Sequence, residues 1–522
     1  MVFSFEINSM MHFLKNIKSA LPVLIVLTVV MLYVSGAGAE DPPSDKPVTL
    51  HEKLTLLCKI PQDATVFIQT INVNFPLMDT IAFAVKTIKD PKGVAVLSNN
   101  TMGPVYDNIS SLGPLFSPDG KRLAYIARHV NKSYAIVDGK QSGPFESIAN
   151  IAFSHDGSRV AFLARDLNKN HFMVLDGVKG ASYAGAQGNG FPMFSPDSAN
   201  VVFPVYKQSK WMMVINGSEN DLFDGIKAFV FSPDSKHYSY IARQGDSWFL
   251  IRDGKKGVPC SDIYTLSYSP DSKHVVYTAR ISGKHVLVFD ETIQGDWDGV
   301  SPAFFSHDSS RYIYSVKKGD KSRIMIGNNK GPWYKSIGPC HFSPDSSRFA
   351  YVAASDKSSF VVIDHKKGKE YESVSVPIFS PDSSKTAYRV KHGKKQHIVL
   401  SGKDLDEYDS VSWFNFSRDS RRFAYVVSNN SKSFVIMDGK QLPSYDKISM
   451  VSFSPDSRHI AYQAFRDDKW FMVVDSVESR ETFKGFLNNI PLMFTDHDTF
   501  RALAIRSGDY PEFYSIGIDI HQ

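Results

Sequence analysis

The sequence predicts an all-β chain folded as a β-propeller, and one repeated turn carries most of that prediction. Ten copies of a Ser-Pro-Asp-Ser turn or a close variant occur, each marked by its first serine. These serines are Ser117, Ser154, Ser195, Ser232, Ser269, Ser306, Ser343, Ser380, Ser417 and Ser454. Neighbouring copies are 37 residues apart, except for 41 residues between Ser154 and Ser195. A fixed period in this range indicates stacked supersecondary units.

One period contains several short strand patterns and no helical pattern. In the copy that begins at Phe342, the apolar residues predict strands over 349–353, 360–363, 371–374 and 376–379. Four short strands in about 40 residues are typical of one propeller blade, which buries each face of its sheet against a neighbouring blade.

The turn residues support this interpretation. Pro presets the backbone of a tight turn, while Ser and Asp bond to nearby backbone N–H groups, so the Ser-Pro-Asp turn is expected to join the first and second strands. Pairs such as Asp138-Gly139 and Asp438-Gly439 end the third strand, where a two-residue hairpin needs residues that tolerate positive φ. Both kinds of turn are therefore predicted on the same face of the ring.

Two degenerate units extend the array, which gives about twelve four-stranded blades. Residues 79–97 have the pattern of a second and a third strand, and residues 494–520 have the pattern of a blade that stops after its third strand. The segment from Val48 to Leu57 is expected to supply the missing strand and close the array. Because propellers usually have 4 to 8 blades, two propellers over residues 40–300 and 301–522 are preferred, with a boundary near residues 299–303.

The N-terminus predicts export from the cytoplasm. Lys15 and Lys18 precede an apolar run over 21–34, which is followed by Ala37-Gly38-Ala39, as in a secretory signal peptide over residues 1–39. The run is shorter than the roughly 20 residues of a spanning helix, so cleavage is expected, with an uncleaved membrane anchor as the alternative. The expected location is extracytoplasmic, either periplasmic or secreted.

The composition argues against nucleic-acid binding and against a fold held together by disulfides. A net charge of +5 on 522 residues is too small for a nucleic-acid footprint. Three cysteines are too few for a disulfide framework in a chain of this length, so the core must hold the fold.

The repeat resembles the WD-type propeller repeats with an SPDG signature, known from TolB-like periplasmic propellers and from the propeller domains of prolyl oligopeptidases. The residues that carry the resemblance are Phe116-Ser117-Pro118-Asp119-Gly120 with the following Leu123-Ala124-Tyr125, and the same pattern continues to Asp456. The resemblance implies the fold but no single function, because this family has many roles. The sequence contains no G-x-S-x-G motif, so peptidase activity is not implied.

The turn residues themselves are interpreted as structural. A turn Asp recurs in every clear copy, whereas a catalytic residue is needed once. The Ser-His-Asp triplets at 154–156 and 306–308 are consecutive, and a catalytic triad converges from separated positions. The basic residues that follow the turns, such as Arg122 and Arg348, are expected to pair with the turn Asp of their own or the next blade, with an anion-binding belt as the alternative.

Two further groups of residues give no indication of a catalytic or metal-binding site. Aromatic residues before the next blade, such as Trp297 and Tyr334, are expected to pack in the core. The residues predicted to line the inside of the ring include one His and no carboxylate, so no catalytic, cofactor or metal site is predicted. They are Leu115, Ala152, Met193, Val230, Ser267, Phe304, His341, Ile378, Asn415 and Ser452.

The face opposite the tight turns is the predicted binding surface, because we expect it to hold the longer loops. Basic residues recur where the second strand ends, and Trp residues, which are frequent at binding hot spots, stand near the start of the third strand. The candidate residues are Arg128, Arg165, Tyr206, Trp211, Arg243, Trp248, Arg280, Lys317, Lys391 and Trp470.

The sequence therefore favours a non-enzymatic propeller that binds a protein, peptide or glycan through this face. Two alternatives stay open: an enzyme that acts on a polysaccharide or small ester, and a purely structural component of the cell envelope. An uncleaved leader would add association with the envelope membrane. Neither a cofactor nor a nucleic-acid partner is expected.

Overall fold

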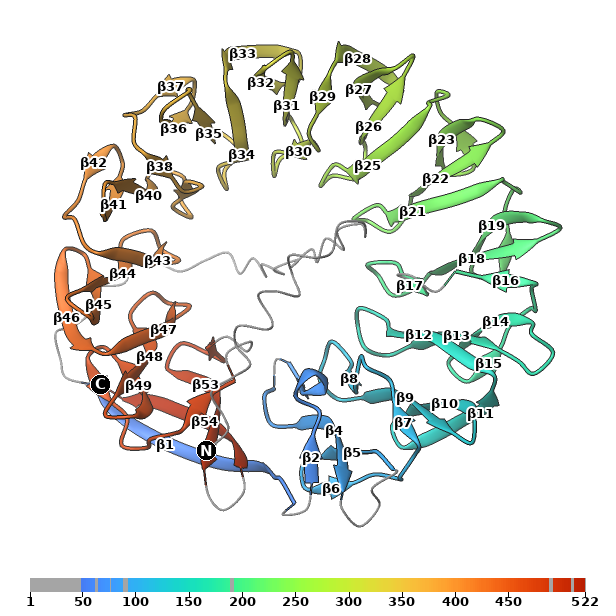
Figure 1. Ribbon diagram of the computed structural model, residues 1–522, viewed down its shortest axis with the longest axis horizontal. Coiled ribbons are helices and arrows are strands. Elements are labelled where there is room, and N and C mark those ends of the chain that lie inside the picture. Colours follow the sequence, from blue (N-terminus) through green and yellow to red (C-terminus); the bar gives the residue numbers. More distant parts are fainter. Residues whose placement is uncertain are drawn as a thin grey trace. The chain divides into compact units, whose positions relative to one another are not determined.

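Twelve antiparallel sheets follow one another along the chain and form the blades of a single β-propeller ring (Figure 1). The structure is a computed structural model that describes residues 48–61, 64–75, 77–87, 93–187, 192–487, 492–507 and 511–521. The predicted leader, residues 1–39, lies outside these residues. Within the described residues the single helix is the 3-10 turn η1 (Ile68–Thr70), and none is long and apolar enough to span a membrane. The predicted all-β propeller of twelve blades is confirmed.

Each blade has four strands, and Figure 1 shows the first strand nearest the centre of the ring and the fourth strand at the outside. Six blades have an unbroken first strand: β12 (Ser147–Phe153), β21 (Gly225–Phe231), β25 (Asp262–Tyr268), β34 (Ser336–Phe342), β43 (Ser410–Phe416) and β47 (Lys447–Phe453). In the other six the first strand is split into β2 (Ala64–Val66) and β3 (Asn72–Val73), β7 (Asn108–Ile109) and β8 (Leu115–Phe116), β16 (Gly185–Ala186) and β17 (Met193–Phe194), β29 (Gly299–Val300) and β30 (Phe304–Phe305), β38 (Ser373–Val374) and β39 (Ile378–Phe379), and β51 (Gly485–Phe486) and β52 (Met493–Phe494).

The second and third strands form the centre of each blade and carry most of its buried apolar residues. The second strands are β4 (Ile81–Thr87), β9 (Leu123–His129), β13 (Val160–Arg165), β18 (Val201–Lys207), β22 (Tyr238–Gln244), β26 (Val275–Ile281), β31 (Tyr312–Lys318), β35 (Phe349–Ala354), β40 (Thr386–His392), β44 (Phe423–Asn429), β48 (Ile460–Arg466) and β53 (Thr499–Ser507). The third strands are β5 (Ala95–Ser98), β10 (Lys132–Val137), β14 (His171–Leu175), β19 (Lys210–Ile215), β23 (Ser247–Arg252), β27 (Lys284–Phe289), β32 (Lys321–Ile326), β36 (Ser359–Ile363), β41 (Lys395–Leu400), β45 (Lys432–Met437), β49 (Lys469–Val474) and β54 (Pro511–His521).

The fourth strands are short in most blades. They are β6 (Thr101–Met102), β11 (Lys140–Phe145), β15 (Val178–Lys179), β20 (Ser218–Glu219), β24 (Lys255–Lys256), β28 (Thr292–Trp297), β33 (Asn329–Tyr334), β37 (Lys366–Lys367), β42 (Lys403–Asp404), β46 (Lys440–Tyr445), β50 (Val477–Glu478) and β1 (Thr49–Lys59). The sequence pattern predicts that residues 371–374 and 376–379 are separate strands of one blade. Instead, Asp364 and His365 adopt positive φ and turn the chain back at once into β37, while β38 and β39 begin the next blade.

The predicted closure of the array by the N-terminal segment is confirmed. Strand β1 pairs with β54 from Thr49 opposite His521 to Lys59 opposite Glu512, so it is the fourth strand of the last blade. Leu57 and Cys58 of β1 are buried together with Phe83 of the first blade and Phe513 of the last. The first and last blades therefore share a core.

The structure has one ring where the sequence analysis preferred two propellers. Apolar residues fill the contact between every pair of neighbouring blades, including the pair on either side of residue 300, where Leu287 packs with Tyr314 and Val316. The described residues from 48 to 521 accordingly form one compact unit. The 37-residue period is the same in one ring or two, so it could not distinguish them.

Two faces of the ring are defined by the connections between strands. The turn face holds the Ser-Pro-Asp turns and the hairpins between third and fourth strands, and their contact, such as Leu123 N–H donating to Asp138, confirms that both lie on one side. The opposite face holds the connections between second and third strands. The expectation of longer loops there is wrong for most blades, because residues such as Val130 and Asn131 adopt positive φ and make two-residue hairpins.

Candidate functional site

The ten candidate residues all lie where the second and third strands meet the opposite face. Within a blade they face one another across the ladder: Tyr206 pairs with Trp211, and Arg243 pairs with Trp248. Candidate residues of different blades occupy equivalent positions. The structure therefore brings together the candidates of one blade, while the ten residues as a whole are distributed around the opposite face. The remaining residues are paired in the same way: Arg128 with Ser133, Arg165 with His171, Arg280 with His285, Lys317 with Ser322, Lys391 with Gln396, and Trp470 with Phe465.

The aromatic members are held in fixed, half-buried positions. The rings of Tyr206 and Trp211 lie 5.2 Å apart between centroids. In the blade of Tyr206 the first strand begins with Gly185, which is the ladder partner of Tyr206, and a Cβ on Gly185 would lie 3.0 Å from the Cβ of Tyr206. A larger residue there would displace the ring, so the glycine positions it.

Two cations lie near the ring of Trp248. The ammonium of Lys227 is 4.3 Å from the centre of its ring, and the guanidinium of Arg243 is 5.9 Å away. Such cation–π contacts contribute about 0.5–1 kcal/mol at exposed sites. Lys227 also forms an ion pair with Asp262 of the next blade, which links the two blades at this point.

The basic candidates divide into paired and unpaired residues. Arg165 donates to Glu146 at 2.9 Å, and Lys391 lies 2.9 Å from Glu372. The other four are exposed and make no ion pair with any carboxylate of the described residues; they are Arg128, Arg243, Arg280 and Lys317. These four side chains can therefore meet the charge of a partner without first breaking an ion pair.

Three residues of this surface were missed by the sequence analysis: Asp224, Lys227 and Asp262. Asp224 accepts a hydrogen bond from the N–H of Gly245 at 2.7 Å, and this bond, together with nearby Lys210, holds the pKa of its carboxyl below the usual range. For Asp224 a signal was available, because Asp also follows the aromatic position at Asp107 and Asp298.

The Ser and Asp of the repeated turn are engaged with the backbone of the turn face. The Ser343 hydroxyl is fully buried, donates to Asp345 at 2.6 Å and accepts from the N–H of Arg348 at 2.9 Å. The serine hydrogen bond is the main reason that the pKa of Asp345 lies far below its usual range. In the 154–156 triplet Ser154 likewise donates to Asp156, so its proton does not go to His155.

The basic residues after the turns do not pair as the sequence analysis expected. Arg348 donates through Nε to Asp364 at 2.8 Å, the Asp of the hairpin between third and fourth strands, rather than to a turn Asp. Its Nη1 donates to the carbonyl of Ser383 in the next blade at 3.2 Å. The arginine therefore joins two blades.

The inner strands present mostly uncharged side chains. Leu115 and Phe304, two of the ten residues predicted to line the inside of the ring, are 36% and 52% exposed. Among the described residues, no group of three or more His, Cys, Asp or Glu side chains is arranged to hold a metal ion.

Comparisons with known proteins identify similar solved structures but no family. Neither a protein-family model nor a curated protein matches the sequence. The chain is similar to a solved eukaryotic initiation factor, at 13% identity and a TM-score of 0.31 over 70% of this chain and 94% of that chain. It is also similar to a hydrazine synthase from Kuenenia stuttgartiensis, at 10% identity and a TM-score of 0.24 over 47% of this chain and 93% of that one. The strand pairing itself establishes that the chain is a twelve-bladed β-propeller.

Proposed function

We propose that this chain is an extracytoplasmic binding or scaffold protein that recognises a protein, peptide or glycan through its opposite face, without catalysis. The observation that carries the proposal is the row of exposed basic side chains at equivalent positions in neighbouring blades, without carboxylate partners among the described residues. These are Arg243, Arg280 and Lys317 of three consecutive blades, together with Arg128.

The aromatic residues beside these cations suit recognition. Trp and Arg are the residue types that most often dominate binding energy at interfaces. The packed blades hold Trp248 and Trp211 in place, so little side-chain entropy is lost when a partner binds. A partner with carboxylates or other anionic groups next to an apolar surface would match this pattern.

The proposal also includes a location outside the cytoplasm and a relationship to TolB-like propellers. The basic, apolar and small-residue segments of residues 1–39 support export to the periplasm or the outside of the cell. The SPDG-type turns support a place among TolB-like propellers. If the leader is retained, it would also attach the ring to the envelope membrane.

The proposal is tested by affinity capture from the native envelope with quantitative mass spectrometry. The double variant Arg243→Ala, Trp248→Ala is compared with wild type and with Lys273→Ala, whose exposed side chain lies on the turn face. The expected result is a partner that wild type and the Lys273 variant both retain and the double variant loses. Identical partners for all three proteins, each shown to be folded by its unfolding temperature, would contradict the proposal.

A further inference from the structure

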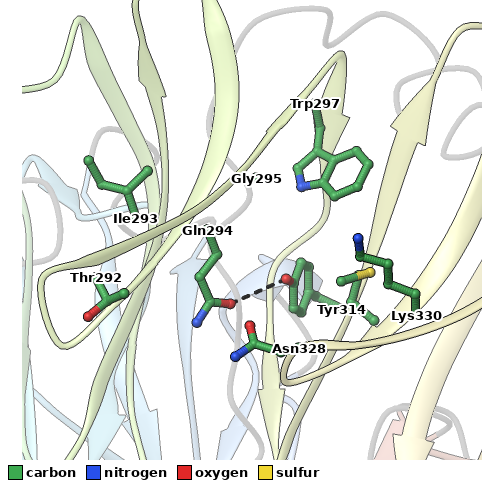
Figure 2. A pocket seen from close by; sticks show the side chains of 9 residues that line it. Thr292, Ile293, Gln294, Gly295, Trp297, Tyr314, Asn328 and Lys330 are labelled. Atoms are coloured by element: carbon green, nitrogen blue, oxygen red, sulfur yellow. Dashed lines mark hydrogen bonds between the residues drawn. The ribbon is translucent and has the colours of Figure 1, made fainter.

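A pocket of about 460 Å³ lies between two neighbouring blades, and none of the opposite-face residues of the proposed function lines it (Figure 2). One wall is the fourth strand β28, and the other consists of residues from β31 and β32 and of the hairpin that leads into β33. This volume is in the range of sites for small molecules. The chemistry of its walls defines the class of ligand.

Gln294 provides a fixed amide at the centre of the pocket. Its Nε2 donates to the Tyr312 hydroxyl at 2.7 Å, and the Tyr314 hydroxyl lies 3.4 Å from its Oε1. Burial raises the pKa of Tyr314 well above its usual value, so the hydroxyl stays protonated and can donate to that oxygen. Figure 2 shows Asn328 from the next blade close to this pair. The two tyrosines therefore hold the Gln294 amide in one orientation.

The indole of Trp297 forms the upper wall in Figure 2 and carries an unused donor. The β27–β28 register shifts between His285 and Leu287, and Gly295 adopts a φ of 81°. A Cβ on Gly295 would overlap the indole nitrogen, so glycine is required for Trp297 to lie here. Its Nε1 is buried and has no hydrogen-bond partner among the described residues. Such a donor is costly unless it meets an acceptor.

The walls contain no acidic residue, and Lys330 is the one charged side chain among those that line the pocket. No carboxylate in the walls could balance the charge of a cationic ligand, and Lys330 is the one side chain that could balance the charge of a phosphate. The other polar groups are neutral: the Thr292 hydroxyl and the amides of Gln294 and Asn328, each able to donate and accept. Ile293, which is 47% exposed, and Met325 add apolar surface.

We infer that this pocket binds a neutral saccharide of one or two rings. Sugar hydroxyls donate and accept like the amides that face them, and the C–H face of a sugar ring packs on an aromatic ring such as that of Trp297. The site does not use the opposite-face residues, so it can fail or succeed independently of the function proposed above.

The test is a titration of the purified full-length chain with N,N′-diacetylchitobiose, cellobiose and maltose, followed by calorimetry and ligand-observed NMR. At least one disaccharide is expected to bind, and Asn328→Ala and Gln294→Ala are each expected to weaken it about tenfold, equivalent to about 1.4 kcal/mol. Trp297→Ala, which removes the aromatic ring on which a sugar would pack, should also weaken binding. Asn329→Ala is the matched control, because Asn329 is exposed, adjacent and outside the pocket walls, and it should bind as wild type does.

Three outcomes would overturn the inference. The first is no binding of any of the three disaccharides. The second is binding that all four variants leave unchanged. The third is binding of an uncharged peptide, acetyl-Ala-Leu-Thr-amide, that is lost in Asn328→Ala while no disaccharide binds, which would assign the pocket to a peptide instead. Because Asn328 is exposed, its variant should fold normally, and its unfolding temperature checks this.

Discussion

The hydroxyl of Ser198 accepts a hydrogen bond from the backbone N–H of Asp156 in the preceding blade, at 3.0 Å. Ser198 has a φ of 64°, a conformation that costs an L-residue roughly 1–2 kcal/mol. The equivalent contact recurs around the ring, from Asp197, Asp234, Asp271, Asp308, Asp345, Asp382 and Asp419 to Ser235, Ser272, Ser309, Ser346, Ser383, Ser420 and Ser457. The fourth residue of the repeated turn is therefore a link between blades.

Ser198→Ala should lower the free energy of unfolding by about 1–2 kcal/mol, because it removes the link and keeps the unfavourable φ. Ser198→Gly should cost less, since glycine adopts this φ freely, as Gly157 does at the same place in another blade. Urea denaturation of the two variants beside wild type measures the difference. Equal stability of all three proteins would show that the hydroxyl is not a link.

Arg348→Met should destabilise the ring by about 1–2 kcal/mol, because it removes the contacts to Asp364 and to the Ser383 carbonyl while the apolar stem remains. Thermal and urea unfolding measure the loss. The control is Arg421→Met, whose side chain is 65% exposed and 4.0 Å from Asp419, and a change within about 0.5 kcal/mol is expected there. Equal losses for both variants would mean that the link between blades contributes nothing.

His459 should make stability depend on pH. Burial alone would lower its pKa, but the hydrogen bond to Asp475 and the charges of Asp475, Asp456 and Asp498 raise it above the ordinary value. A raised folded pKa adds stability that is fully present below about pH 6.5, the unfolded value, and is lost as the pH rises through the folded pKa.

The measurement is the unfolding temperature of wild type and His459→Gln from pH 5.5 to 9. The advantage of wild type should be largest at the acid end and shrink as the pH rises. An advantage that grows with rising pH would contradict this assignment.

Removal of strand β1 should open the ring. A chain that starts at Val48 keeps the pairing of β1 with β54, whereas a chain that starts at Pro61 leaves β54 as an unpaired edge and removes buried Leu57 and Cys58. The shorter chain should unfold at a lower temperature and bind a hydrophobic dye, and a synthetic peptide of residues 49–59 should reverse both effects. Equal unfolding temperatures of the two chains would show that closure by β1 is dispensable.

Much of the fold could be predicted because each blade is specified by a short sequence pattern that repeats along the chain. The spacing from Ser117 to Ser454 defines the blades, and the alternating residues of β1 identify it as the closing strand. The number of rings could not be predicted, because it depends on small rotations between blades that are set by packing such as that of Leu287 against Tyr314.

The candidate surface could be predicted only in part, for a similar reason. Arg243 and Trp248 stand at recurring positions, but the place of Lys227 over the indole depends on a neighbouring strand. Trp297 was interpreted as a core residue like other aromatics at its position. The structure confirms that Trp297 packs against the core around Leu287 and Tyr314. Its indole also lines a pocket, because Gly295 adopts a φ of 81° and leaves room for it, and the sequence period does not report that conformation.

Site-specific photo-crosslinking in the native envelope tests the binding face most directly. A benzophenone side chain is placed at Arg280 on the opposite face and, in a second protein, at Lys273 on the turn face of the same blade. The binding proposal predicts a crosslinked partner from position 280 and none from position 273. A partner captured from position 273 alone, or from neither position, would contradict it.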